Sequence, residues 1–325
     1  MKRFVIASCV IVVMGGLILM DSSLHAQPYP SRPIQMIIPM GAGSAGDIGG
    51  RLLAEDLKKI LKTDIVVVNK PGASMVMGTD QVAKGKKDGY TIAYTNVTAM
   101  VNAHALEPEN VPYDPIKDFE PLGLHMFFPV AIAVLENSPL KSFADFVEDG
   151  KKNPEKIRIS SPGIQTTSSL NVFIIENVTG AKYIQIPYKE GVTAITSVLG
   201  GNVEAITFAF SGLIPFATSG KLRILLTSKK MSDFQNVPTF QELGYKQELP
   251  SPWFALYAPA GIPDEVKKVL IPAIKQAVSS PETVARLKKM GGSLVDYKSP
   301  AELRKIMVDE YEVISAIAKK IGLRK

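Results

Sequence analysis

The chain is poor in the residues that most often carry catalysis or bind metals. Its 325 residues include one cysteine, Cys9, and three histidines. One cysteine excludes an intrachain disulfide framework. No H-E-x-x-H, G-x-S-x-G or C-x-x-C pattern accompanies His104 or His125, so we expect both to be structural. Aromatic residues make up only 7% of the chain, and lysines and glutamates are interspersed, which argues against a nucleic-acid-binding protein.

The one long apolar run lies at the N-terminus and has the pattern of a secretory signal peptide. Lys2 and Arg3 precede the run, which extends from Phe4 to Met20, and residues 24–26 offer a small-residue cleavage site before Gln27. The alternative is an uncleaved membrane anchor, because the run is nearly long enough to span a bilayer.

Two features of the sequence favour a cleaved signal peptide over a membrane anchor or a lipoprotein. Gly15-Gly16 interrupts the run and a polar segment follows it, which favours cleavage. The tetrapeptide ending in Cys9 mimics a lipoprotein box, but the apolar stretch before it is too short for lipidation. We therefore expect 1–26 to be a signal peptide and the protein to be periplasmic. The mature chain of 299 residues (325 minus 26) loses Cys9, and its formal charge changes from +6 to +5. This length suffices for two lobes, and this charge suits a small acidic ligand.

A glycine-rich loop follows the first expected strand, Ile34 to Pro39. Residues 40–51 read M-G-A-G-S-A-G-D-I-G-G-R and lead into a helix with an apolar face. Backbone amides and the helix dipole make such a loop an anion site. Its Gly41-x-Gly43-x-x-Gly46 spacing also matches a dinucleotide fingerprint. That interpretation needs an acidic residue after the second strand, where Asn69 stands, and a compartment that contains the cofactor.

Strand and helix patterns alternate along the rest of the chain, which predicts an α/β fold with parallel or mixed sheets. A first βαβαβ unit ends at the strand Tyr90 to Tyr94, and a second unit begins near Pro129. Further strands are expected at 130–135, 157–159, 184–187, 203–208, 222–226 and 255–258, and helices at 142–151, 264–278, 282–290 and 300–320.

The second unit contains a loop that resembles the glycine-rich loop of the first unit, because small residues again precede a helix. Small hydroxyl residues at Ser160 to Ser169 precede a helix that continues through Leu170. Such residues are often only N-caps. Two loops of this kind in separate α/β units, however, predict that a ligand is gripped from both sides. We expect lobe 1 at 27–127 plus 248–325 and lobe 2 at 128–247, joined by crossings near Leu124 to Pro129 and Gln247 to Trp253.

An ordered set of short motifs resembles the extracytoplasmic solute receptors of tripartite tricarboxylate transporters, also called Bug receptors. The resemblance covers essentially all of 27–325. Its motifs are Tyr29-Pro30-Ser31-Arg32-Pro33-Ile34, the glycine-rich loop ending in Arg51, Asn69-Lys70-Pro71-Gly72-Ala73, Lys87-Asp88-Gly89-Tyr90-Thr91, Pro187-Tyr188-Lys189, Leu199-Gly200-Gly201, Ser219-Gly220-Lys221-Leu222-Arg223, Val237-Pro238-Thr239 and Ala258-Pro259-Ala260-Gly261.

The resemblance implies a two-lobed periplasmic binding protein of the type II-like, Venus-flytrap kind, with flanking helices on each sheet. It implies a monomeric receptor, not an enzyme, without metal or cofactor, that delivers a small organic acid to membrane permease subunits. The ligand carboxylate is expected against the first loop through backbone amides. The implied ligand-binding residues are Met40, Gly41, Ala42, Gly43, Ser44, Ala45, Gly46, Asp47, Ser74 and Asn96 in lobe 1, and Ile164, Gln165, Thr166, Thr167, Ser168, Lys189 and Phe208 in lobe 2.

The sequence departs from the family pattern in lobe 2. After Gly163 it lacks the second glycine and the histidine common in relatives, it has Glu190 where glycine is usual, and it has Phe208 where aspartate is frequent. These departures predict a ligand whose distal part is less polar than that of citrate. Two alternative hypotheses remain. One is a ligand sensor or adaptor for a signalling partner. The other is an exported α/β enzyme, although no catalytic sequence signature joins Ser44 to His104 or His125.

Overall fold

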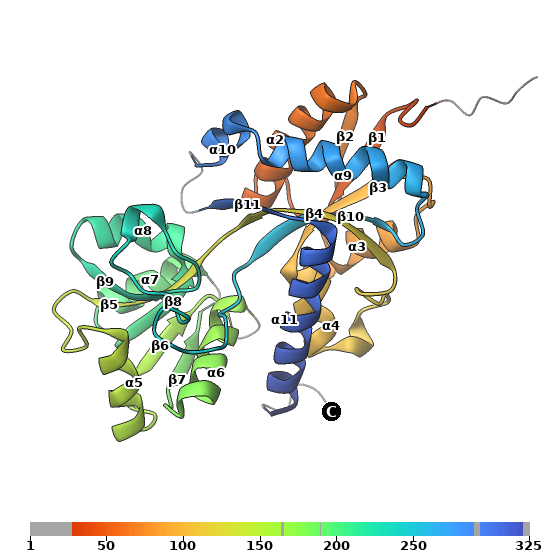
Figure 1. Ribbon diagram of the computed structural model, residues 1–325. Helices are drawn as coiled ribbons and strands as arrows, with labels where there is room; N and C mark the ends of the chain where they lie inside the picture. The colour runs from red at the N-terminus through yellow and green to blue at the C-terminus, as the bar shows by residue number, and fades with distance from the viewer. Residues whose placement is uncertain (1–27, 164–165, 189, 289–292, 321–325) are drawn as a thin grey trace, which may run out of the picture.

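The protein has two α/β units, each built on its own sheet. The computed structural model describes residues 28–163, 166–188, 190–288 and 293–320. Figure 1 shows the first unit at the upper right and the second at the lower left, with the chain crossing between them. The predicted signal peptide, 1–26, lies outside the described residues. No helix in the described part is both long and apolar enough to span a membrane.

The first sheet is mixed, with the strand order β11-β4-β10-β3-β1-β2. Strand β1 pairs in parallel with β2 and β3, which confirms the predicted βαβαβ unit, while β10 runs antiparallel between β3 and β4. The strands are β1 (Ile34–Ile38), β2 (Ile65–Asn69), β3 (Thr91–Asn96), β4 (Phe119–Phe127), β10 (Trp253–Pro259) and β11 (Leu294–Lys298).

The second sheet is also mixed and comes from one continuous stretch of chain. Its order is β7-β6-β8-β5-β9, with β6 parallel to β7 and β8, and β5 antiparallel to β8 and β9. The strands are β5 (Val130–Leu135), β6 (Arg158–Ser161), β7 (Ile184–Pro187), β8 (Ala205–Ala209) and β9 (Leu222–Thr227). The prediction of two mixed sheets with flanking helices is therefore confirmed.

Helices cover both sheets. The first unit has α2 (Ala45–Leu61), η1 (Ala73–Met75), α3 (Val76–Ala83), η2 (Thr98–Asn102), α4 (Ala103–Leu106), η3 (Pro108–Asn110), α9 (Asp264–Val278), α10 (Pro281–Lys288) and α11 (Pro300–Lys320). The second has α5 (Phe143–Lys152), α6 (Thr167–Thr179), α7 (Gly191–Leu199), α8 (Phe210–Thr218) and η4 (Ser232–Phe234).

Local sequence signals account for several helix boundaries. In α2, Leu53 and Leu57 are completely buried, as the apolar face of the sequence predicts. Helix α5 begins with the predicted capping box, in which Ser142 and Asp145 each accept a backbone N–H of the other residue. The predicted helix ending at Met290 is seen only to Lys288, because 289–292 lie outside the described residues.

Strand β4 corrects the sequence prediction of the first crossing. Residues Leu124 to Phe127, taken as part of that crossing, belong to the strand, so the connection to β5 consists only of Phe128 and Pro129. The prediction missed β4 because Pro121 and Gly123 interrupt its pattern, although seven of its nine residues pair with β10, and three of those seven also pair with β11.

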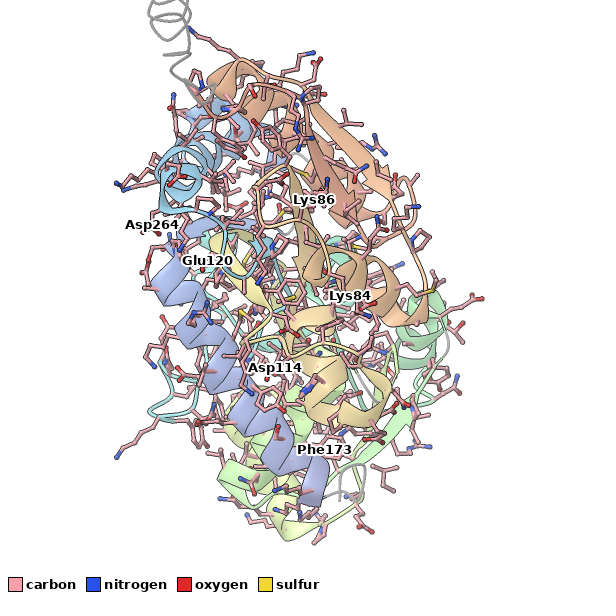
Figure 2. The ribbon with its side chains drawn as sticks, turned by 90° about the vertical axis from the view of Figure 1, so that its right-hand side faces the viewer. Lys84, Lys86, Asp114, Glu120, Phe173 and Asp264 are labelled. Atoms are coloured by element: carbon pink, nitrogen blue, oxygen red, sulfur yellow. The ribbon has the colours of Figure 1, made fainter. Side chains whose placement is uncertain are left out.

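Helix α11 joins the two units on one side. It packs against β4 and α4 of the first unit and against α6 of the second. In Figure 2 it runs from the region of Glu120 down to Phe173, which belongs to α6. Phe173 packs against the same apolar cluster that contains Ile314 and Ile317 of α11. The two units are therefore connected by a shared core as well as by the two crossings.

Candidate functional site

The strand register brings three loops of the first unit to one edge of its sheet. Because β1 is parallel to β2 and to β3, with Ile38 opposite Asn69 and Ile37 opposite Ala93, the carboxyl ends of all three strands lie together. The connections that follow them are 39–44, 70–75 and 97. A site at such an edge is the usual ligand position in α/β proteins with parallel strands.

The crossings lie at that same edge. Strand β10 is antiparallel to β3, with Phe254 opposite Asn96, so the chain enters β10 beside the carboxyl end of β3. The two crossings are hydrogen-bonded to each other, since the Phe128 N–H donates to the Pro252 carbonyl at 2.7 Å. The hydroxyls of Ser228 and Ser251 are also hydrogen-bonded, at 2.7 Å.

The second sheet presents its own loops to the crossings. Val130, at the start of β5, lies opposite Ala209, at the end of β8. Strands β6 and β7 run in the same direction as β8, so all three end at the edge where β5 begins. The loops after β6, β7 and β8 and the three loops of the first unit are therefore located at the two sheet edges that the crossings connect.

Asp47 organises the glycine-rich loop from inside. Its buried carboxylate accepts the Gly43 N–H at 2.8 Å, the Asn69 amide at 2.8 Å and the Arg51 Nε–H at 3.0 Å. Burial alone would raise the pKa of Asp47, but the hydrogen bonds from Arg51, Asn69 and Gly43 outweigh it and hold the pKa below its ordinary value. The Asn69 amide also donates to the Met40 carbonyl at 2.9 Å.

The loop leads directly into the start of α2. Ser44 is the N-cap, and its hydroxyl accepts the Asp47 N–H at 3.2 Å. The amides of Ala45 and Gly46 belong to the first turn, where a helix cannot supply acceptors of its own. With the Asp47 charge balanced by Arg51, this turn can accept a carboxylate through the helix dipole and those amides. Gly43 adopts a φ of +80°, which glycine allows without strain.

Aromatic rings support the loop from behind, and sequence reasoning missed them. A Cβ at Gly46 would lie 2.5 Å from the Phe254 ring and 2.5 Å from the Met40 sulfur, so both side chains pack on this glycine. Phe254 stacks on Tyr94 and meets Phe128 edge-on, each at 5.6 Å between ring centroids. No local signal marks Phe254, because β10 reaches the loop only through the tertiary fold.

In the second unit, the hydroxyls before α6 mostly bond within their own loop. The Thr166 hydroxyl caps the helix by accepting the Ser169 N–H at 3.4 Å and donates to the Gly163 carbonyl at 2.8 Å. The Ser169 hydroxyl donates to the same carbonyl at 2.7 Å. The capping alternative therefore describes these hydroxyls, while Thr167 and Ser168 are buried in the first turn of α6.

Phe208 is half-buried at the end of β8. A Cβ at Gly191 would lie 2.5 Å from its ring and one at Gly212 would lie 2.6 Å from it, so the ring occupies space left by two glycines, one in α7 and one in α8. It also packs against the apolar cluster of the second unit. Ile164, Gln165 and Lys189 lie outside the described residues, as does the side chain of Ser74. The Asn96 side chain accepts the Thr98 N–H at 3.0 Å.

Both histidines of the described chain pair with tyrosines. Nδ1 of His125 lies 2.8 Å from the Tyr94 hydroxyl, and Nδ1 of His104 lies 2.9 Å from the Tyr311 hydroxyl. Burial disfavours the imidazolium form of His125 and lowers its pKa to about 3, although the charge of Asp56 opposes this. Within the described ranges, no group of three or more His, Cys, Asp or Glu side chains is arranged to hold a metal ion.

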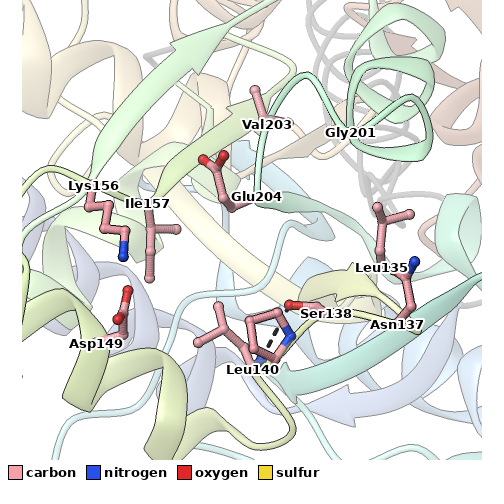
Figure 3. Close-up of a pocket in the computed structure, with 11 residues that line it drawn as sticks. Leu135, Asn137, Ser138, Leu140, Asp149, Lys156, Ile157, Gly201, Val203 and Glu204 are labelled. Atoms are coloured by element: carbon pink, nitrogen blue, oxygen red, sulfur yellow. Dashed lines mark hydrogen bonds between the residues drawn. The ribbon is translucent and has the colours of Figure 1, made fainter.

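A cavity of about 440 Å³ lies at the other edge of the second sheet (Figure 3). It is lined by Leu135 at the end of β5 and by Ile157 and Glu204 just before β6 and β8. In Figure 3 the Ser138 hydroxyl accepts the Leu140 N–H, at 3.2 Å, in the turn at its base. Since β6 and β8 begin here, this cavity is separated from the loops at the crossings by the length of the sheet.

The chain is similar to solute-binding receptors. A family model described as "Tripartite tricarboxylate transporter family receptor" matches residues 50–323. A UPF0065 protein of Bordetella bronchiseptica is 34% identical over 82% of this chain and 79% of its own length. Protein BugT of Bordetella pertussis is 30% identical over 93% of each chain. The crystal structure of a TctC solute binding protein from Polaromonas is 28% identical, with a TM-score of 0.83 over 90% of this chain and 99% of that one.

Proposed function

Because this chain belongs to the tripartite tricarboxylate transporter receptor family, the Bug family, we propose that it captures a small carboxylate-bearing ligand between its two units and delivers it to the transporter's membrane subunits. The family and the similar structures are solute-binding receptors. What we propose for this chain is the chemical class of its ligand and the membrane partner that receives it.

One observation carries the ligand class. The first turn of α2 presents backbone amides at the edge where the crossings join the units, and the one acid in that turn, Asp47, is buried and paired with Arg51. A ligand carboxylate would meet amide donors and a helix N-terminus there without a competing negative charge. The ligand-contacting set that we propose is the one expected from the sequence, with Asp47 acting through the loop geometry.

We further propose closure of 27–127 plus 248–325 against 128–247. Exposed apolar side chains support it, because Ile48 (42% exposed), Met77 (63%) and Val192 (71%) lie at the starts of α2, α3 and α7, which follow strands ending at the facing edges. Closing the units would cover these side chains and gain hydrophobic stabilisation. Small-angle scattering of the mature protein should show compaction when a saturating ligand is added.

Export and partnership complete the proposal. We propose that 1–26 is removed, that the mature protein acts as a monomer in the periplasm, and that its closed form is recognised by permease subunits. A sensor or adaptor whose closed form contacts a signalling protein uses the same binding step. The test is co-purification of the liganded mature protein with membranes. Binding to membranes that contain the permease subunits, and not to membranes that lack them, would identify the permease as the partner.

A thermal-shift screen tests the binding function. Mono-, di- and tricarboxylates are added to the mature protein, with the corresponding primary amides as uncharged controls. A ligand present at about 100 times its dissociation constant adds about 2.7 kcal/mol of stability. We expect at least one carboxylate to raise the melting temperature while its amide does not, and calorimetry then gives the affinity. A screen in which amides and carboxylates act alike would contradict an anion site at the start of α2.

A further inference from the structure

The cavity at the far edge of the second sheet combines an apolar floor with one acid and one lysine at the same end. Its volume is about 440 Å³, and Leu135, Pro139 and Leu140 form its floor. Pro139 is exposed and Leu135 is half-buried, so this floor is open to an occupant. Asp149 of α5 and Lys156, just before β6, lie together at one end in Figure 3. An apolar hollow with a few convergent polar groups is the usual form of a small-molecule site.

The acid and the lysine have no ion-pair partners. In Figure 3 the Lys156 ammonium points toward the Asp149 carboxylate, but no ion pair of 4.0 Å or less joins them, and neither pairs with another charge among the described residues. Both groups are accessible, since Lys156 is exposed and Asp149 is half-buried. The other acid of the cavity, Glu204, is paired with Arg158 at 2.6 Å. Asp149 and Lys156 therefore offer one negative and one positive partner to the same bound molecule.

The position of Asp149 favours a bound cation. It lies in the last turn of α5, which ends at Lys152, so its negative charge is near the carbonyl end of the helix dipole, where an anion is disfavoured. The Asn153 amide donates to one Asp149 oxygen at 2.8 Å, and the other oxygen accepts no hydrogen bond within the described part of the chain. A ligand ammonium can donate to that free oxygen and balance its charge.

Lys156 supplies the opposite charge for a second group of the same ligand. A carboxylate beside the ammonium can pair with Lys156, while an apolar side chain covers the floor at Leu135 and Pro139 and removes apolar surface from water. An apolar α-amino acid carries these three groups on one carbon atom. A monoamine or a monocarboxylate of the same shape satisfies only one of the two charges.

We infer that this cavity is a second small-molecule site, which binds an apolar α-amino acid with its ammonium at Asp149 and its carboxylate at Lys156. None of the residues that line the cavity belongs to the set proposed for the carboxylate ligand, and the cavity lies at the opposite edge of the second sheet from the crossings. The inference therefore goes beyond the proposed function and does not depend on it.

Nuclear magnetic resonance of the methyl-labelled mature protein tests the inference, with L-phenylalanine as the probe. The signals followed are the methyl groups of Leu135 and Leu140, so binding at the start of α2 does not interfere. We expect saturable shifts with a dissociation constant of about 1 to 10 mM, which is reasonable for twelve non-hydrogen atoms at an accessible site. Two matched probes, 2-phenylethylamine without the carboxylate and 3-phenylpropionate without the ammonium, should each bind at least about threefold more weakly, because accessible ion pairs contribute modestly.

Two substitutions at accessible positions make the test specific. Asp149→Asn keeps the side-chain shape and removes the charge, so L-phenylalanine should lose its advantage over 3-phenylpropionate. Lys156→Met keeps an unbranched apolar stem, so the advantage over 2-phenylethylamine should disappear. Asp233→Asn, in the exposed segment η4 after β9, is the control and should change neither preference. Equal affinity for the three probes, an unchanged preference in either cavity variant, or no saturable shift of the two methyl signals in the wild type would overturn the inference.

Discussion

The carboxylate of Asp47 accepts the backbone N–H of Gly43 at 2.8 Å, which closes the glycine-rich loop on the first turn of its own helix. The same carboxylate holds Arg51 and Asn69, so one buried acid fixes the loop, the helix start and the end of β2 together. The loop is therefore shaped before any ligand arrives.

Replacing Asp47 by Asn should destabilise the protein. In the variant, the N–H donors of Gly43, Asn69 and Arg51 lose a charged acceptor, because asparagine has only one side-chain oxygen and no charge. Hydrogen bonds to a charged group contribute about 1.5 to 3 kcal/mol. Because Arg51 is partly exposed, we expect a loss of about 2 kcal/mol in the free energy of unfolding in urea at pH 7. Asp64→Asn, at an exposed pair with Lys58, should cost much less, because water screens that pair.

The effect of Asp47 should also depend on pH. Since its folded pKa is lowered, its contribution is present above the unfolded pKa of about 3.8 and is lost as the pH falls through the folded value. The wild type and Asp47→Asn should therefore converge in stability below pH 4. A constant difference from pH 7 to pH 2.5 would show that ionisation of Asp47 is not responsible.

Gly43→Val should weaken carboxylate binding more than Ser44→Ala does. Gly43 has a φ of +80°, and a β-branched residue is strained there, although a Cβ would meet no atom within 4 Å. A backbone penalty of about 1 to 2 kcal/mol that shifts the loop corresponds to roughly a tenfold loss of affinity. Calorimetry on the folded variants measures it.

Gly43→Asn serves as the matched control, because asparagine tolerates the left-handed region. It should bind within about threefold of the wild type. Ser44→Ala should instead lower stability by about 1 kcal/mol through loss of the N-cap. A Gly43→Val protein that folds and binds normally would show that the shape of this loop does not control binding.

Phe208→Ala should weaken a branched or aryl monocarboxylate selectively. The half-buried ring offers an apolar surface and no hydrogen-bonding group, so a second carboxylate beside it would be desolvated without compensation. We expect the wild type to prefer such a monocarboxylate over succinate and citrate. Loss of the ring should weaken that ligand by about 1 to 2 kcal/mol and leave succinate nearly unchanged.

Phe208→Leu and Phe208→Asp complete this comparison in competitive binding. Leucine keeps an apolar surface and should preserve the order of preference, whereas aspartate should reverse the advantage of the apolar ligand. If the wild type prefers citrate and Phe208→Asp leaves the order unchanged, the ring only packs between Gly191 and Gly212.

His125→Gln should reduce the acid sensitivity of the fold. His125 is completely buried and its folded pKa is about 3, against about 6.5 in the unfolded chain. Between these values the unfolded state binds a proton that the folded state does not, so stability falls as the pH is lowered, by up to 1.4 kcal/mol per pH unit.

Urea unfolding at pH 7, 6, 5 and 4 measures this difference. From pH 6 to pH 4 the wild type should lose about 2 kcal/mol more than His125→Gln. The two proteins should keep a constant difference from pH 7 to pH 8, where neither state of the wild type gains a proton at this residue. Parallel stability curves down to pH 4 would mean that His125 is protonated in the folded protein.

Sequence patterns were sufficient where neighbouring residues carry the signal. The parallel strands β1 to β3, the capping box at Ser142 and the N-cap position before α6 follow from local spacing. Strand β11 was missed because its five residues, LVDYK, include two charged side chains and it is defined mainly by pairing with β4 at the sheet edge. Pairing of that kind depends on distant residues and leaves little trace in a short segment.

The glycine-rich loop was recognised from its sequence, but its supporting residues were not. Asn69 was interpreted as the start of a turn and as the absence of an acid, whereas in the structure its amide bonds to Asp47 and to the Met40 carbonyl. Phe254 is 208 positions beyond Gly46, and only the placement of β10 beside β3 brings it behind the loop. Contacts across such separations arise from topology, which periodicity does not encode.

The position of β10 determines the order in which the two units can be completed. All strands of the second sheet lie within 130–227, so that unit has its whole sheet as soon as this stretch has been synthesised. The first sheet lacks the strand between β3 and β4 until residues 253–259 emerge from the ribosome. The unit that begins the chain is thus the last whose sheet can be completed during synthesis.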